Sequence, residues 1–279
     1  MQAPEDHYIK IRNIKTRYWT AGDTGPNVVL IHGLGRFVEE WLPNIDTFAA
    51  HNRVYALDLP GHGHTDKPLS GSYRLLDIAG FVHDFLVALD IRPVHVIGHS
   101  LGGGIALQLI LQFPEAVDKL VLVCSAGLGK EATLVLRIAS VPWLGEILTR
   151  PSLNGTKRLL KEFVNDRALL TDDFVELNYR MAALPGAQQA VLKTLRSAGN
   201  LFGQYNETYR PIVENLELIK CPVLIIWGRQ DRVLPITHGQ AAEKVLPNAR
   251  LKILEGCGHL PMLEHTQLFN DTILDFLSN

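Results

Sequence analysis

Residues 94–104 read VHVIGHSLGGG, in which a serine between glycines follows a run of apolar, β-branched residues. The run at 94–97 predicts a buried strand, and Gly103 to Ile110 predicts a buried helix directly after it. The pattern Gly-x-Ser-x-Gly between a strand and a helix is typical of a tight turn that projects a nucleophilic serine. Its small residues keep the neighbouring backbones from colliding. Ser100 is therefore the predicted nucleophile, at the N-terminus of a helix whose dipole favours negative charge.

A second junction between a strand and a loop lies upstream, where residues 28–35 read VVLIHGLG. An acyl-transfer serine needs backbone N–H donors where negative charge develops on the carbonyl oxygen. Glycines at a strand end allow such N–H groups to face a ligand. We expect the N–H groups of Leu34 and of Leu101, the residue after the serine, to form this oxyanion hole. The alternative is that His32-Gly33 only ends the strand as a turn.

An acid and a base follow two further predicted strands. Residues 221–228 read CPVLIIWG, a buried strand, and a polar turn then presents the carboxylate of Asp231. Residues 249–254 alternate as a half-exposed strand and lead to His259, which glycine and proline place on a loop. The chain order Ser100, Asp231, His259 is one of the known orders of a serine hydrolase triad.

With these motifs the chain resembles the α/β-hydrolase family, in the form that carries a cap, over nearly all of its length. The resemblance implies Ser100 as nucleophile, His259 as general base and acid, and Asp231 as the carboxylate that orients the imidazole. It also implies an oxyanion N–H on Leu34, after the His-Gly pair.

Residues 54–65, VYALDLPGHGHT, resemble the D-x-P-G-x-G-x-S motif of the same family, with Thr65 where serine is more usual. We interpret this segment as structural, a strand and a sharp turn near the site, and Asp58 as part of that turn. His62 and His64 lie near Asp66, but no third or fourth ligand has suitable spacing, so no metal site and no cofactor are expected.

Alternation of apolar runs with helical patterns from Val28 onward predicts an α/β fold with a mostly parallel, doubly wound sheet. Residues 8–12 and 14–19 predict a hairpin of edge strands. The alternation stops in the middle of the chain and helical patterns replace it. We therefore predict a core of residues 1–127 and 206–279 and an inserted helical cap of residues 128–205. Substrate contacts are expected from Trp143, Met181 and Leu260, and apolar cap residues such as Leu144 and Leu184 are further candidates.

Composition narrows the class of protein. The 279 residues are 47% hydrophobic with a net charge of −2, which predicts one large core and gives no reason to expect nucleic acid or an anionic membrane as partner. The polar first residues show no secretory signal, and no apolar run is long enough to span a bilayer. The three cysteines lack metal-type spacing and suit a reducing cytoplasm. The expected partner is a small molecule, and the oligomeric state stays undetermined.

A serine at position 100 argues against the dehalogenases and epoxide hydrolases of the family, which carry aspartate there. Esterases, lactonases and C–C bond hydrolases of ring-cleavage products all keep serine. The C–C hydrolases typically have arginine where Asn178 stands, tryptophan at Leu260 and asparagine at His99. No cluster of basic pocket residues is visible, so we expect uncharged short- to medium-chain esters or lactones, cleaved through an acyl-enzyme. C–C cleavage is the alternative, as is a triad-bearing receptor or signalling protein with little turnover.

Overall fold

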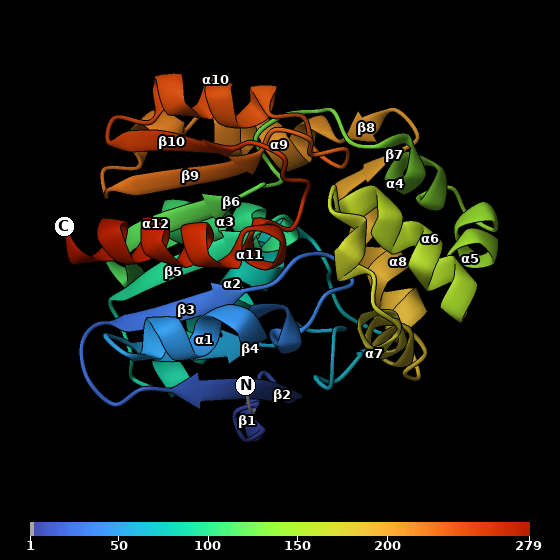
Figure 1. Cartoon of the computed structure of the whole chain (residues 1–279), viewed down its shortest axis with the longest axis horizontal. Coiled ribbons are helices and arrows are strands. Elements are labelled where there is room, and N and C mark those ends of the chain that lie inside the picture. The colour runs from blue at the N-terminus through green and yellow to red at the C-terminus, as the bar shows by residue number, and fades with distance from the viewer. Residues whose placement is uncertain (1–2) are drawn as a thin grey trace.

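The computed structural model describes residues 3–279 and contains a central sheet of eight strands in the order β1-β2-β4-β3-β5-β6-β9-β10 (Figure 1). Strand β2 pairs antiparallel with β1 and β4, and the strands from β4 to β10 pair parallel. The predicted α/β fold with a mostly parallel sheet is confirmed. The strands are β1 (His7–Ile11), β2 (Ile14–Ala21), β3 (Asn27–Ile31), β4 (Arg53–Leu57), β5 (Val94–His99), β6 (Val117–Val123), β9 (Val223–Gly228) and β10 (Ala249–Leu254).

Helices cover both faces of this sheet, which explains why its central strands are continuous apolar runs rather than alternating ones. In β3, Val29 and Ile31 pack into the hydrophobic cluster on one face, and Val28 and Leu30 into that on the other. The first cluster is covered by α2 (Leu75–Ala88), α3 (Leu101–Gln112), α9 (Asn206–Val213) and α10 (Thr237–Val245). The second is covered by α1 (Leu42–Ala49), α11 (Pro261–Glu264) and α12 (Thr266–Ser278).

Between β6 and α9 the chain forms a group of short helices at the end of the sheet toward which the arrowheads of β5, β6 and β9 point (Figure 1). This is the segment for which we predicted the cap, and we use that name for residues 128–205. It contains α4 (Leu134–Ala139), α5 (Leu144–Leu148), α6 (Leu153–Phe163), α7 (Asp172–Ala182), α8 (Ala187–Ala198), β7 (Gly199–Asn200) and β8 (Gly203–Gln204). In residues 3–279, no helix is both long and apolar enough to cross a membrane.

The turn after β4 is organised around the buried carboxylate of Asp58. Its Oδ1 accepts a hydrogen bond of 2.8 Å from the N–H of Val38, and its Oδ2 accepts one of 2.8 Å from the N–H of His64. The guanidinium of Arg17 lies 3.3 Å from the same oxygen. Gly63 has φ +48°, and a Cβ there would lie 2.1 Å from Asp58 Oδ2, so only glycine fits. These contacts agree with a structural role for the segment.

Candidate active site

Ser100 lies at the turn between β5 and α3, with φ 50° and ψ −115°, a backbone conformation that side-chain-bearing residues seldom adopt. The residues on either side explain the glycines of the motif. A Cβ at Gly98 would lie 2.5 Å from the carbonyl oxygen of Gly102, and one at Gly102 would lie 2.2 Å from that of Ile31. The strained turn therefore requires small residues and holds the serine at the carboxyl end of the sheet.

The structure brings Ser100, His259 and Asp231 together although they are far apart in the chain. The Ser100 hydroxyl donates to His259 Nε2 at 2.9 Å, and His259 Nδ1 donates to Asp231 Oδ2 at 2.7 Å. The imidazole is buried, and the Asp231 side chain is almost completely so. This arrangement can take the serine proton onto the imidazole and hold the resulting positive charge against the carboxylate.

Burial alone raises the pKa of the Asp231 carboxyl, but the charge of His259 and the hydrogen bonds that the carboxylate accepts lower it further than burial raises it. Besides the imidazole, the backbone N–H groups of Val233 and Leu234 donate to Oδ1 at 2.7 and 3.1 Å. The net pKa lies below the ordinary value, so Asp231 stays ionised and orients the imidazole.

Cys124, which the sequence analysis did not assign to the site, lies directly after β6 beside the acid. It is fully buried with φ 44°, and burial together with the charge of Asp231 raises the pKa of its thiol well above the usual range. Ligand atoms of Cys124, Asp231 and His259 lie within 4.8 Å of one another, the one such group of potential metal ligands in residues 3–279. The hydrogen bond between Asp231 and His259 already engages two of the three.

The N–H groups predicted for the oxyanion hole belong to residues that line the cavity beside Ser100, namely Leu34 and Leu101. Leu101 is the first residue of α3, where helix N–H groups lack intrahelical acceptors. Leu34 follows the loop after β3, and Gly33 packs so closely that a Cβ there would lie 2.8 Å from His99 Nδ1. That these two N–H groups form an oxyanion hole stays a prediction.

Behind the triad lies a buried network of charged groups that sequence patterns did not reveal. His99 Nδ1 donates to Glu40 Oε1 at 2.9 Å and Nε2 donates to the carbonyl oxygen of His259 at 2.9 Å. Glu40 Oε2 also accepts from Arg36 Nε at 2.7 Å. Arg36 in turn donates to the Oδ1 of Asn178 on cap helix α7. The network therefore joins the backbone of the catalytic histidine candidate to the core and the cap.

Glu40 is completely buried, and burial alone would raise its pKa. The charge and hydrogen bond of His99, followed by the charge of Arg36, instead lower the pKa to about 2. Both ring nitrogens of His99 face oxygen atoms, those of the Glu40 carboxylate and of the His259 backbone carbonyl, so the ring is fixed between the two.

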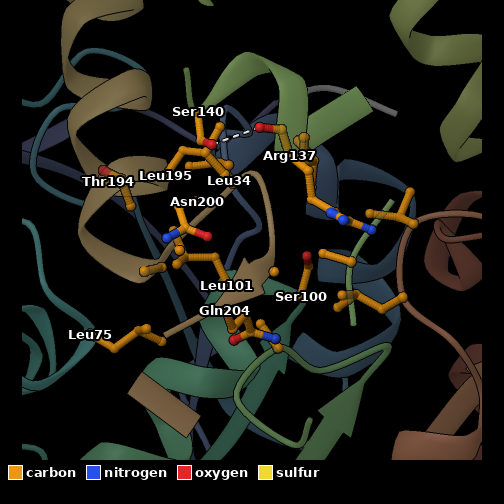
Figure 2. A pocket seen from close by; sticks show the side chains of 18 residues that line it. Leu34, Leu75, Ser100, Leu101, Arg137, Ser140, Thr194, Leu195, Asn200 and Gln204 are labelled. Carbon is orange, nitrogen blue, oxygen red and sulfur yellow. Dashed lines mark hydrogen bonds between the residues drawn. The ribbon is translucent and has the colours of Figure 1, made fainter. Parts of the chain in front are cut away.

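An apolar cavity opens from Ser100 between the core and the cap (Figure 2). The core contributes mainly aliphatic side chains, and the cap contributes α4, the end of α8 and the β7–β8 hairpin. Polar side chains on the wall come from the cap: Arg137, Ser140, Thr194, Asn200 and Gln204. The larger aliphatic lining residues are Leu34, Leu75, Leu101, Leu136, Leu195, Val233 and Leu234.

The three predicted substrate contacts, Trp143, Met181 and Leu260, lie in different places relative to the cavities. Leu260 is fully buried and lines a smaller cavity with Ser100 and His259, so its position fits the prediction. Trp143 is 84% exposed and lines neither cavity, so its assignment as a pocket residue is wrong. It precedes the five-residue helix α5, which is too short for a periodic pattern to indicate its inward face. Met181 is buried, but it too lies outside both cavity walls.

Arg137 was missed because a single basic residue in a helical pattern is usually a solvent-facing one. In the structure it lies on the cavity wall, with Nε donating to the carbonyl oxygen of Leu201 at 2.6 Å. Asn200, another wall residue, accepts the N–H of Phe202 through Oδ1 at 2.8 Å. Figure 2 shows Arg137 and Asn200 on different sides of the space next to Ser100.

Known proteins resemble this chain in sequence and in structure. A family model described as the alpha/beta hydrolase fold matches residues 26–266. A 2-hydroxy-6-oxononadienedioate/2-hydroxy-6-oxononatrienedioate hydrolase of Comamonas testosteroni is 31% identical, over 96% of this chain and 93% of that protein.

Two solved structures are similar over 98% of this chain. A meta-cleavage product hydrolase from Pseudomonas fluorescens IP01 has a TM-score of 0.85 and 27% identity, with 97% of that chain covered. A putative lipase from Acinetobacter baumannii AYE has a TM-score of 0.84 and 26% identity, with 90% of that chain covered. The similar proteins thus include a meta-cleavage product hydrolase and a putative lipase.

Proposed function

Because the chain belongs to the α/β-hydrolase family, we propose that it hydrolyses uncharged short- to medium-chain carboxylic esters or lactones through an acyl-enzyme on Ser100. The observation that carries this proposal is the continuous hydrogen-bond chain from Ser100 through His259 to Asp231, with the serine opening into a largely aliphatic cavity. The substrate is a small molecule.

In the proposed reaction His259 Nε2 takes the proton of the Ser100 hydroxyl as Oγ attacks the ester carbonyl carbon. The carbonyl oxygen becomes an oxyanion that the N–H groups of Leu34 and Leu101 stabilise. As the intermediate collapses, the imidazolium gives its proton to the leaving alcohol and the acyl-enzyme remains. A water molecule, deprotonated by the same imidazole, then releases the carboxylic acid and restores the serine.

The character of the cavity supports an uncharged acyl group. Most of its lining side chains are aliphatic, and Arg137 is the one charged residue among them. A buried carboxylate needs a cationic partner, so only the part of the wall beside Arg137 could hold one. The three cysteines are free and buried or half-buried, which fits the cytoplasm as the proposed compartment.

C–C bond hydrolysis of a ring-cleavage product is the second candidate, and two observations favour it. Similar proteins bear that activity in their names, and Arg137 puts one cation on the cavity wall. Two other positions favour the ester. Asn178 is engaged by Arg36 and donates to the carbonyl oxygen of Phe174 at 2.7 Å, and Leu260 is apolar.

The discriminating experiment compares kcat/KM for p-nitrophenyl esters from acetyl to palmitoyl, an acyl-homoserine lactone and a ring-cleavage dienoate, with Ser100→Ala as the blank. The proposal expects the best values among esters of short or medium chain or the lactone. A preference for the dienoate of more than about tenfold over every ester would replace it by C–C hydrolysis. Labelling of Ser100 by a fluorophosphonate without turnover of any substrate would favour a receptor.

A further inference from the structure

Exposed large apolar side chains are concentrated on α4, α5 and α6. Of the eighteen large hydrophobic residues exposed in the described chain, eight lie within residues 134–161, a tenth of its length. The most exposed are Trp143 at 84%, Ile147 at 72%, Leu134 at 58% and Leu148 at 56%. Figure 1 shows α5 at the outer edge of the cap, away from the sheet.

The same segment is strongly basic although the whole chain has a net charge of −2. To the end of α6, residues 134–163, it holds five cationic residues and the two carboxylates of Glu146 and Glu162, a local charge of +3. Of the two carboxylates, Glu146 is already paired with Arg196 at 2.7 Å. Among residues 3–279, Arg150, Arg158 and Lys161 take part in no salt bridge. The five cations are Arg137, Arg150, Lys157, Arg158 and Lys161.

This segment combines the exposed tryptophan and aliphatic residues of α5 with Arg150, which follows that helix, and with the cations of α6. Such a combination suits the headgroup region of a bilayer that contains anionic lipid. We propose that residues 134–161 dock this protein on an anionic phospholipid surface, with Trp143 and Ile147 entering the headgroup boundary. A second protein copy would bury the apolar residues equally well but would bring its own cations against these, so charge complementarity favours the lipid.

The docking surface adjoins the substrate cavity. Leu136, Arg137 and Ser140 line the cavity from α4, and Leu134 and Val135 of the same helix are exposed. If the proposed ester hydrolysis holds, an apolar ester dissolved in the bilayer would meet the protein close to that cavity wall. This consequence rests on the proposed function, but the docking itself does not, because binding needs no turnover.

The test measures binding of the full chain, as the inactive Ser100→Ala variant, to large unilamellar vesicles by sedimentation. Vesicles of phosphatidylglycerol and phosphatidylcholine in equal amounts are compared with phosphatidylcholine alone. We expect binding to the anionic vesicles that falls as salt is raised, because the Debye length shortens from about 10 Å at 0.1 M to about 3 Å at 1 M. No binding to anionic vesicles at low salt would overturn the proposal.

Tryptophan fluorescence locates the contact, because the other three tryptophans, Trp19, Trp41 and Trp227, are each at most 1% exposed. A blue shift on adding anionic vesicles would therefore report Trp143, and Trp143→Phe should abolish the shift. An unshifted spectrum with bound protein would assign the docking to another surface and contradict the proposal.

Matched variants separate the two components of the surface. Trp143→Ser/Ile147→Ser and Arg150→Glu/Arg158→Glu should each weaken vesicle binding by on the order of tenfold. The core controls change exposed residues that lie outside the cap: Leu218→Ser for the apolar change and Lys10→Glu/Lys252→Glu for the charge change. These variants should bind vesicles as the parent does. Equal losses in the core controls would refute a local surface. So would a dimer in light scattering that the Trp143→Ser/Ile147→Ser variant loses, without vesicle binding by the parent.

Discussion

All four apolar residues of β3, Val28 to Ile31, are fully buried, whereas Leu144, Ile147 and Leu148 of α5 are 40 to 72% exposed. The central strands of the sheet are covered on both faces, so their buried apolar side chains pack into one of two hydrophobic clusters. In the cap, α4 and α5 leave large apolar side chains exposed. The core therefore fixes the geometry of the reacting groups, and the cap has surface left for substrate access and contacts with other molecules.

The largest effect should come from the core. Ser100→Ala removes the nucleophile, and we expect kcat to fall on the order of a millionfold, since only the oxyanion donors and substrate binding remain. Incubation with a fluorophosphonate followed by peptide mass analysis should find the adduct on Ser100 and none in the variant. Full activity in Ser100→Ala with an adduct elsewhere would disprove the assignment.

Asp231→Asn should rank next, with a loss of on the order of three to four decades in kcat, because an amide can hold the imidazole in the wrong tautomer. Its matched control is Asp58→Asn, which changes another buried carboxylate at a strand end of the same sheet. That carboxylate accepts from Val38 and His64 and lies beside Arg17. The control should lower the melting temperature and leave kcat per folded molecule nearly unchanged; the reverse pattern would mean that the acid is Asp58.

Two glutamates, one buried and one exposed, show how burial changes the contribution of a carboxylate to the free energy of unfolding. The pKa of Glu40 in the core and that of Glu146 in the cap are both lowered to about 2. For Glu40 the folded pKa lies below the unfolded value, so its stabilisation is present above pH 4.5 and is lost as the pH falls toward 2. At neutral pH the shift corresponds to about 3 kcal/mol of unfolding free energy.

Urea unfolding between pH 6 and pH 3 measures that contribution. Glu40→Gln should be less stable at pH 6 and should lose less stability on acidification than the parent. Glu146→Gln removes an exposed pair with Arg196, which solvent screens, so its unfolding free energy should follow that of the parent. Indistinguishable acid profiles for Glu40→Gln and the parent would show that the buried network does not stabilise the fold.

The contrast between the buried sheet and the exposed cap helices also explains which features the sequence could predict. The sheet strands were predictable because strands buried on both faces are continuous apolar runs. Ser100, Asp231 and His259 were predictable because each comes shortly after such a predicted strand. The contact between His99 and Glu40, 59 residues apart, depends on how η1 (Val38–Trp41) packs against β5, which no local pattern encodes. The inward face of α5 was unpredictable for a related reason, since five residues make little more than one turn.

The smallest expected effect distinguishes two apolar cap residues that the sequence could not tell apart. Leu136 lines the cavity with Ser100, and Trp143 is exposed outside it. Leu136→Ala enlarges the cavity, so the preferred p-nitrophenyl ester should lengthen and kcat/KM for short chains should fall by about tenfold or more, the effect of one methylene of lost contact. Trp143→Ala should leave kcat/KM for water-soluble esters within about twofold of the parent, because no substrate in the cavity touches it. If Trp143→Ala instead changed the chain-length profile and Leu136→Ala did not, the cap would have to rearrange on binding substrate. The contrast between a buried core that fixes the site and an exposed cap would then be wrong for these two residues.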